Sequence, residues 1–211
     1  MDAGSLYREQ QELAKKAILI DSFGQVKRIG GADCSYLDDE LVIGGLVVLD
    51  YEGLKPVYRT FSVQRLAFPY VPGLLAYREA GALMEAVQEA KVGFDVLMVD
   101  GFGANHPRRC GIATHIGVKL DVPAIGVGKS FLCGEIKGEY VYQDGERVAK
   151  MLYPKGLKRP IYVSPGHRIS LETAAGIVLV SIKKGRLPEP LRLAHEYVTQ
   201  LKKIIVHPFK E

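Results

Sequence analysis

Three carboxylate residues stand at positions where a polar side chain is unexpected. Asp33 interrupts a strand-like run among small residues, Glu79 lies on the apolar side of a helical pattern, and Asp100 ends an apolar run. Oxygen ligands of this kind suit a hard cation such as Mg²⁺ or Mn²⁺ better than zinc. An ion held by them could activate water and stabilise charge on a leaving oxygen. The residue types therefore predict metal-assisted hydrolysis.

Glu79 is the most anomalous of the three. Leu75 and Leu83 belong to the apolar stripe of the helical pattern that follows Gly73, and Glu79 lies four residues from each. The helical repeat therefore places Glu79 on the same stripe. A carboxylate left unpaired there is costly, so we expect a metal ion, a lysine or an arginine beside it. A structural ion pair, or a side chain reaching water at the edge of the stripe, is the alternative.

Asp33 and Asp100 each also have an ordinary structural explanation. Asp100 follows the run 96–99 at what would be the carboxyl end of a strand, where open α/β sheets bind ligands, but it could equally be a turn residue. The small residues around Asp33 leave room for a ligand, but a bulge or an edge strand would also account for them. The prediction depends on the first strand, the crossing helix and the next strand bringing the three carboxylates together.

The elements that would position these residues follow an α/β order. Apolar periodicity and turn residues predict a mixed sheet, three antiparallel strands and then parallel strands, flanked by helices in the ribonuclease-H-like manner and forming a single domain over 1–211. The strands are expected at 26–36, 41–50, 56–65, 96–99 and 122–127, with a hairpin-rich segment at 132–163. The helices are expected at 5–17, from Gly73 to about Lys91, at 107–120 opened by Pro107, at 171–184 and at 189–205.

Composition is that of a soluble globular protein. The 211 residues fit one domain, and 47% hydrophobic with 25% charged residues excludes disorder. The net charge of +4 is compatible with a polyanionic partner but does not establish one. Three cysteines without a CxxC pair argue against a zinc knuckle or a disulfide framework. No signal peptide or membrane-spanning run is visible, so a cytoplasmic protein is predicted.

Basic residues flank the acidic positions. His106-Pro107-Arg108-Arg109 stands at the predicted start of a helix, where N–H groups and arginines can bind phosphate, although exposed arginines are common there. Lys129 follows Gly126-Val127-Gly128 in a run that is similar to the end of a phosphate-binding P-loop. That motif requires glycine where this chain has Pro123, so the P-loop is excluded, while a lysine beside a phosphate stays a prediction.

Six blocks, in order along the chain, resemble the endonuclease V family. They are Gly31–Tyr36, Pro69–Glu79, Asp100–Arg109, Gly126–Ser130, Gly166–Ser170 and Leu191–His195. The second and third blocks are highly specific, and the resemblance covers nearly the whole chain. It implies action on deoxyinosine in DNA, the product of adenine deamination. It also implies hydrolysis of the second phosphodiester bond 3′ to the lesion, giving a 3′-hydroxyl and a 5′-phosphate without excision of the base.

The resemblance implies roles for the matching acidic residues. Asp33 and Asp100 would bind Mg²⁺ directly, with Mn²⁺ able to substitute, and Glu79 would be a third catalytic carboxylate. His195 would occupy a fourth position, as a ligand directly or through water. Periodicity also places His195 four residues after Leu191 on the inner stripe of the last helix, where a satisfied core histidine is the alternative.

The resemblance further implies a DNA-binding set. The segment Pro69-Tyr70-Val71-Pro72 would be a wedge that separates the strands, with Tyr70 stacking where the lesion was displaced. A rigid, proline-flanked aromatic can hold open a base stack at a cost of roughly a few kcal/mol, although such a segment is otherwise a packed turn. His106 and Lys129 would lie near the cleaved phosphate. The remaining matches would form the lesion pocket and DNA contacts: Leu75, Gly101, Gly111, Gly126, Leu132, Arg108 and Arg109.

The departures from the family pattern are small. Val71 stands where many relatives have isoleucine, and the segment 134–160 is less typical of the family, which leaves substrate breadth open there.

Two alternatives stay open. Another ribonuclease-H-like nuclease, acting on inosine-containing RNA or on branched or mismatched nucleic acid, would use the same carboxylates but leave the wedge unexplained. A non-catalytic nucleic-acid binder would be expected to lack the carboxylates, yet all three are present. The expected partner is DNA that contains deoxyinosine. No protein or membrane partner is predicted, and the chain is expected to be a monomer.

Overall fold

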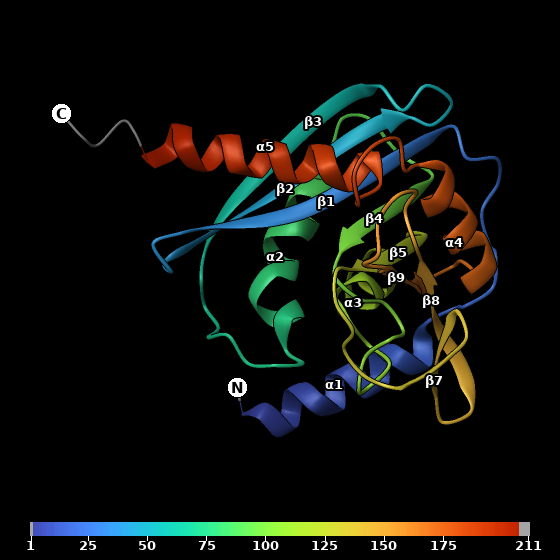
Figure 1. Cartoon of the computed structure of the whole chain (residues 1–211). Coiled ribbons are helices and arrows are strands. Elements are labelled where there is room, and N and C mark those ends of the chain that lie inside the picture. The colour runs from blue at the N-terminus through green and yellow to red at the C-terminus, as the bar shows by residue number, and fades with distance from the viewer. Residues whose placement is uncertain (1, 207–211) are drawn as a thin grey trace.

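The fold, in a computed structural model that describes residues 2–206, is built on a nine-stranded mixed sheet with helices on both faces (Figure 1). The strands lie in the order β3-β2-β1-β4-β5-β9-β8-β7-β6. Their bounds are β1 Arg28–Leu37, β2 Leu41–Asp50, β3 Pro56–Arg65, β4 Val96–Asp100, β5 Ala124–Gly128, β6 Glu135–Lys137, β7 Tyr140–Gln143, β8 Glu146–Leu152 and β9 Ile161–His167. The helices are α1 Ala3–Lys16, α2 Leu75–Gln88, α3 Ile112–Leu120, α4 Leu171–Val180 and α5 Glu189–Val206.

The strand pairing confirms the predicted mixed sheet. β1, β2 and β3 form an antiparallel meander, and β1, β4 and β5 run parallel. The turn between β1 and β2 places Asp38 and Asp39 at positive φ, 45° and 55°, a conformation that aspartate tolerates better than most residues. β5, β9, β8, β7 and β6 then pair antiparallel, so the hairpin-rich segment predicted at 132–163 is present.

Alternating side chains divide the central strands between two apolar layers. One layer packs Leu46, Leu97 and Val99 of the sheet against α2 and α3. The other packs Leu49 and Met98, with further sheet residues, against α4 and α5. α5 therefore crosses one face of β1–β3 while α2 lies on the other (Figure 1). Each fully buried aliphatic side chain contributes about 1.5–3 kcal/mol, so these two layers position the helices firmly.

Two adjacent glycines let α2 and α5 approach the same strand from opposite sides. A Cβ atom at Gly44 would lie 2.6 Å from the backbone carbon of Ala82 in α2. A Cβ atom at Gly45 would lie 2.4 Å from a methyl carbon of Val198 in α5. Neither distance is sterically allowed, so β2 must be free of side chains at both positions. The pair sets how closely the helices that carry Glu79 and His195 approach the sheet.

The helix predicted to start at Pro107 begins five residues later, and that prediction was wrong. α3 starts at Ile112, and residues 104–111 form an irregular turn in which Arg109 has a φ of 56°. The turn is held by backbone hydrogen bonds from Arg109 to His106 and from Gly111 to Gly103. Arg108 and Arg109 therefore do not stand at a helix start, and the phosphate site predicted on that basis is not formed there.

The boundaries of the other elements differ less from the predicted ones. α2 ends at Gln88 rather than Lys91, and α4 ends at Val180 rather than residue 184. β9 extends through Pro165 to His167, which the sequence did not predict because proline and glycine are poor strand residues. A register irregularity beside Ile125 accommodates them.

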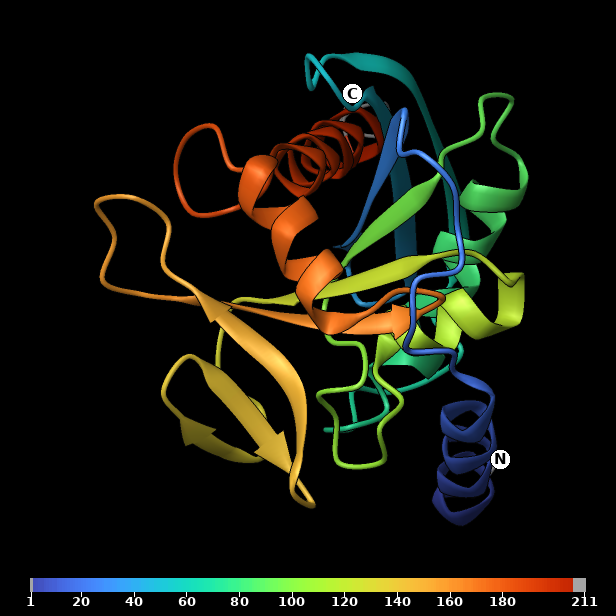
Figure 2. The same ribbon diagram turned by 90° about the vertical axis from the view of Figure 1, so that its right-hand side faces the viewer.

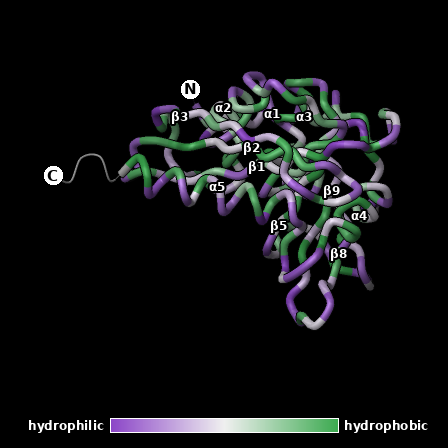
Figure 3. The backbone as a smooth tube through the Cα atoms, turned by 90° about the horizontal axis from the view of Figure 1, so that it is seen from above, coloured by the Kyte–Doolittle hydropathy of each residue, from purple (hydrophilic) through white to green (hydrophobic). Residues whose placement is uncertain are grey.

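The first and last helices are amphipathic. The tube of α5 alternates between hydrophobic and hydrophilic segments (Figure 3). α1 stands apart from the sheet and packs on α3 (Figure 2). Among residues 2–206 there is no helix with the length and apolarity that crossing a membrane requires.

His115 in α3 is expected to make stability pH-dependent. Its side chain is buried against Tyr77, and burial with nearby Lys119 lowers its pKa from 6.5 to about 4. The unfolded chain therefore binds the proton more readily, so the folded protein loses stability as the pH falls from about 6.5 toward 4. His115→Gln should reduce the loss between pH 7.5 and pH 5 by about 2 kcal/mol, measured by urea unfolding at both values. An unchanged difference would contradict this assignment.

Candidate active site

Asp33 and Asp100 lie on the same face of the sheet, on neighbouring parallel strands. The register pairs Ala32 of β1 with Val99 of β4, so the next residues, Asp33 and Asp100, stand at the same level. Met98, two residues before Asp100, packs in the layer on the α5 side of the sheet. Side chains alternate along a strand, so Asp100 points to that side. The sheet thus brings together two of the three predicted carboxylates.

Asp33 is buried, and His195 of α5 bonds to it. The residue is 8% exposed, and Nδ1 of His195 lies 2.8 Å from its Oδ2, while Oδ1 accepts from the backbone N–H of Cys34. Burial, followed by repulsion from Asp100, raises the pKa of Asp33 to about 6. His195 was predicted on the inner stripe of its helix, but its side chain is 56% exposed. One ring nitrogen is therefore turned to Asp33 while the rest of the ring faces the open side.

Lys129 pairs with Asp100. The lysine follows β5 directly, and its Nζ contacts Oδ2 of Asp100 in an ion pair. Arg186, from the α4–α5 connection, donates to the backbone carbonyls of Lys129 and, at 2.6 Å, of Pro160. This arginine therefore ties the Lys129 loop to the β8–β9 loop beside the acidic pair.

Glu79 approaches from the other side of the sheet. It belongs to α2, and its Oε1 accepts a hydrogen bond from the Tyr36 hydroxyl of β1. Arg78 stacks on the Tyr36 ring, with its guanidinium carbon 4.7 Å from the ring centre. Burial raises the pKa of Glu79 to about 7, and repulsion from Asp33 and Asp100 adds to that shift. Glu79 is therefore near enough to the pair to interact with both charges.

The donor set fits a hard cation, although the ligands are not yet gathered around one point. Within residues 2–206, no three His, Cys, Asp or Glu side chains stand together at the spacing of a metal site. Each carboxylate is turned to its own partner: His195, Lys129 or Tyr36. Asp33 is buried and Glu79 partly so, and this burial, with repulsion from Asp100, raises the pKa of both carboxyl groups. A divalent cation would relieve that repulsion, and carboxylate oxygens are its preferred ligands.

A pocket of about 230 Å³ lies beside this acidic site. Four of the predicted lesion-contacting residues line it: Tyr70, Leu75, Gly111 and Leu132. Its other lining residues are Gln10, Gly73, Ala76, Phe102, His106, Cys110, Ile112 and Ser130. Tyr70 is 69% exposed at the rim. Pro69 and Pro72 are also exposed and Val71 is partly so, so the wedge segment is free to meet another molecule.

Gly101 and Gly126 support the pocket without lining it. Gly101 has a φ of 142°, and a Cβ there would lie 2.5 Å from Ile112. A Cβ at Gly126 would lie 2.3 Å from the backbone nitrogen of Gly103. Both glycines are therefore needed for the close packing of the 101–112 segment on β5.

The segment 128–132 joins the pocket to the acidic pair. Lys129 contacts Asp100, while Ser130 and Leu132 of the same segment line the pocket. A larger concavity of about 990 Å³ lies near Lys27, just before β1, and Asp50, at the end of β2. None of the predicted site residues lines it. The arrangement of residues, rather than cavity size, therefore identifies the site.

His106 lines the pocket, and Arg108 lies against its lining residues. His106 is 5% exposed, and its Nε2 bonds to the carbonyl of Gly73 while its Nδ1 accepts from the N–H of Arg108. Burial lowers the pKa of His106 to about 4, so the ring is neutral. The Arg108 guanidinium binds Gln10 and Gly73. Neither side chain has a hydrogen bond or ion pair to the carboxylates in the described part of the chain.

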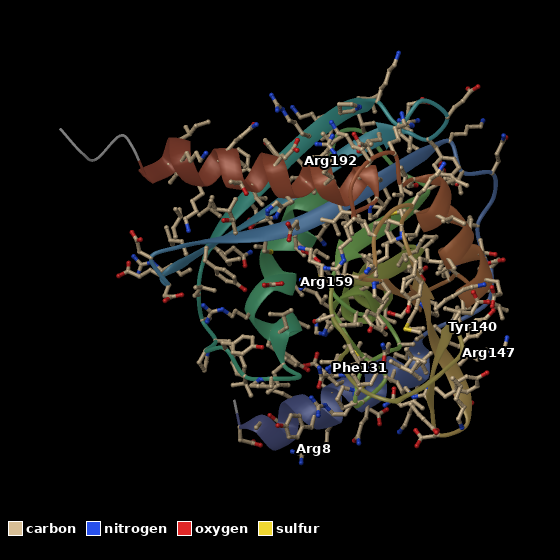
Figure 4. All side chains as sticks on the ribbon, viewed as in Figure 1. Arg8, Phe131, Tyr140, Arg147, Arg159 and Arg192 are labelled. Atoms are coloured by element: carbon tan, nitrogen blue, oxygen red, sulfur yellow. The ribbon has the colours of Figure 1, made fainter. Side chains whose placement is uncertain are left out.

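Arg109 is engaged with the hairpin of β7 and β8. Its guanidinium donates to the carbonyl of Gln143 and lies within 3.6 Å of the carboxylates of Asp144 and Glu146. The hairpin also carries aromatic–basic pairs, of which Arg147 over Tyr140, at 4.2 Å, is labelled in Figure 4. A DNA contact by Arg109 stays a prediction, and it would require the arginine to release one of these partners.

The sequence analysis did not identify Tyr36, Gln10 or Arg186 as site residues. Tyr36 belongs to Gly31–Tyr36, the first block that resembles the endonuclease V family. Its hydroxyl could therefore have been proposed as the hydrogen-bond partner of Glu79. Gln10 is 1% exposed on a helix whose other buried residues are Leu6 and Leu13, and a polar residue on an apolar stripe was the available signal. Nothing in the sequence around Arg186 indicates its contacts.

Known proteins resemble this chain along most of its length. The sequence model of the endonuclease V family matches residues 11–196. Endonuclease V of Dictyoglomus turgidum is 42% identical over 196 residues, which are 89% of this chain and 86% of that protein. Endonuclease V of Aeropyrum pernix is 46% identical over 181 residues, 83% of this chain and 70% of the relative.

Solved structures agree with the sequence relatives. Human ENDOV superposes with a TM-score of 0.87 at 30% identity, covering 96% of this chain and 99% of that one. Endonuclease V of Ciona intestinalis, solved with DNA containing an inosine followed by a ribo-adenosine, has a TM-score of 0.86 at 34% identity, with 95% and 98% covered. Since sequence and fold agree over nearly the whole length, this chain belongs to the endonuclease V family.

Proposed function

We propose that this protein is a DNA repair endonuclease that recognises deoxyinosine and hydrolyses the second phosphodiester bond on its 3′ side. The observation that carries the proposal is the connection, through residues 128–132, between a Tyr70-rimmed pocket and the Asp33–Asp100 pair. A pocket of about 230 Å³ suits one displaced base. The separate acidic site explains a cut in the backbone away from the lesion. The Ciona relative, bound to DNA that contains inosine, supports the same substrate.

Mg²⁺, with Mn²⁺ as a substitute, is the proposed cofactor. Asp33 and Asp100 would hold it, with Glu79 and His195 as further ligands or as partners through water. When bound, such an ion supplies an activated water and neutralises charge on the cleaved phosphate.

The protein's own side chains prepare the site for hydrolysis. Lys129 places a positive charge beside Asp100, where it can also attract the phosphate. The His195 ring, held by Asp33 through Nδ1, presents its other nitrogen toward the open side, where it can carry a proton. Tyr36 keeps its proton, because burial and Glu79 raise its pKa, and so fixes the Glu79 carboxylate by donating to it.

Metal and inosine dependence test the proposal together. We expect cleavage of an inosine-containing duplex with Mg²⁺, none after chelation, and recovery when Mg²⁺ or Mn²⁺ is restored, in a gel assay of labelled strands. Product ends should be 3′-hydroxyl and 5′-phosphate, one nucleotide beyond the lesion. An undamaged duplex of the same sequence is the control. Equal cutting of both duplexes would favour a less specific nuclease, and binding without cutting would favour a non-catalytic protein.

Inosine in RNA is a second candidate substrate. The Ciona protein was solved with an inosine followed by a ribo-adenosine, which shows that this relative accepts a ribonucleotide beside the lesion. Measuring kcat/KM on two substrates that differ only in the sugar on the 3′ side of the inosine, deoxyribose or ribose, would show which one the protein cleaves better. Faster cleavage of the ribonucleotide substrate would identify RNA as the better substrate.

A further inference from the structure

The carbonyl oxygen of Gly73 is the meeting point of three side-chain donors. Nε2 of Gln10 lies 3.0 Å from it, a terminal nitrogen of Arg108 lies 2.6 Å from it, and Nε2 of His106 lies 3.1 Å from it. Gly73 has a φ of 78°, which favours glycine, and a Cβ there would lie 2.7 Å from the arginine. The backbone at this residue is therefore fixed from several directions.

Gln10 connects these donors into one network. Its side-chain oxygen accepts from Nε of Arg108 at 2.5 Å, and its Nε2 also reaches the carbonyl of Cys110 at 3.2 Å. The Arg108 guanidinium is stacked over the ring of Tyr7, 4.1 Å from its centre. Two residues of α1 thus hold the arginine that holds Gly73. We call Gln10, His106 and Arg108 the Gly73 clamp.

The clamp lies between the wedge segment and the pocket. Gly73 directly follows Pro72, and the N–H of Leu74 turns back to the carbonyl of Val71. Gln10, Gly73 and Cys110 all line the pocket as well. A shift of Gly73 would therefore move the wedge segment relative to the pocket wall, and it would move the start of α2, the helix that carries Glu79.

Docking of α1 does not require a glutamine at this position. α1 is already attached by buried Leu6 and Leu13, by the Tyr77 hydroxyl bonded to the Leu6 carbonyl, and by the 2.7 Å ion pair of Glu9 with Lys119. An apolar residue at position 10 would pack without the cost of burying an amide. The polar side chain is instead matched to the groups that border the pocket.

We infer that Gln10 is a positioning residue for lesion recognition, and that α1 contributes it to fix the wedge segment against the pocket through the carbonyl of Gly73. The inference rests on the proposed function. Gln10 does not touch the reacting phosphate; it acts through Arg108 and Gly73. Removing it leaves a partly buried arginine nitrogen and the buried Cys110 carbonyl without their partner, while the volume of the side chain can be kept by methionine.

Selectivity gives the first readout. For Gln10→Met, the ratio of kcat/KM for inosine-containing over undamaged duplex should fall about tenfold or more, because a lost hydrogen bond to a charged group is worth at least one factor of ten. The change should appear mainly in KM, since the carboxylates are untouched. Glu9→Gln is the matched control: it weakens α1 docking at the neighbouring residue without altering the clamp, and should keep the parental ratio.

A single reporter gives a readout that is independent of cleavage. The chain contains no tryptophan, so Tyr70→Trp places one fluorophore on the wedge segment. Time-resolved anisotropy of this residue should show a larger fast-moving fraction when Gln10→Met is added, and no change when Glu9→Gln is added. If Gln10→Met melts below the assay temperature, Gln10→Glu replaces it, because the carboxylate still accepts from Arg108 but cannot donate to Gly73.

The outcomes separate the two proposals. Lower selectivity together with a more mobile indole reporter at position 70, seen only in the Gln10 variant, supports the clamp. A Gln10 variant that matches Glu9→Gln in both measurements overturns it. If the parent protein shows no preference for inosine, the proposed function fails, and the anisotropy comparison alone then decides whether the clamp holds the wedge segment.

Discussion

Asp100→Asn is expected to lower cleavage of inosine-containing duplex by about three orders of magnitude or more, with the fold intact. Asparagine keeps the shape of the side chain but cannot carry the charge that pairs with Lys129 and would bind the cation. The variant also removes a repulsion that raises the pKa of Asp33, so the folded state should not be destabilised. Single-turnover cleavage with Mg²⁺ and thermal melting measure the two effects.

Asp38→Asn is the matched control for this substitution. Asp38 is an exposed turn residue with a φ of 45°, a conformation that asparagine also adopts readily. It should cleave at the parental rate. Parental turnover by Asp100→Asn itself would refute the assignment of Asp100 to metal-assisted hydrolysis.

Tyr70→Ala is expected to reduce the preference for inosine-containing over undamaged duplex by about 10- to 100-fold, since stacking of a base on an aromatic ring is worth about 1–3 kcal/mol. Tyr70 is 69% exposed at the pocket rim, so its loss should cost the folded state little. Binding titrations with both duplexes, using the chelated protein to prevent cleavage, measure the change.

Tyr70→Phe tests whether the ring itself is responsible. Phenylalanine keeps the stacking surface and loses only the hydroxyl, so we expect near-parental discrimination. If Tyr70→Ala weakened binding to damaged and undamaged DNA by the same factor, Tyr70 would be a general DNA contact and the wedge would be rejected.

The parts of the fold that sequence could predict depend on local signals. β2 and β3 have the predicted bounds because turn residues mark their starts: Asp38 and Asp39 between β1 and β2, and Glu52 and Gly53 between β2 and β3. The parallel strands ending at Asp100 and Gly128 were visible as short apolar runs. The sequence predicted that the strands carrying Asp33 and Asp100 would come together, but not the register that aligns the two residues. That register depends on pairing between segments more than 60 residues apart.

The features that the sequence did not predict depend on contacts between residues far apart in the chain. Pro107 resembled a helix start, but Arg108 is held by Gln10, which lies 98 residues away in the sequence. The partner of Glu79 also comes from the tertiary fold: a metal ion beside it stays a prediction, and the contact formed is the neutral hydroxyl of Tyr36, with Arg78 stacked on the tyrosine ring. Local periodicity identifies a side chain that needs a partner, but the tertiary fold chooses the partner.

Gly44 and Gly45 determine how mutation could reposition the side chains of the site. Each one limits the approach of a different helix, and the two helices lie on opposite faces of β2. A methyl group at 44 would push back only the helix bearing Glu79, and one at 45 only the helix bearing His195. The placement of these two side chains can therefore be altered one at a time by single substitutions in β2, the strand that pairs with the Asp33 strand.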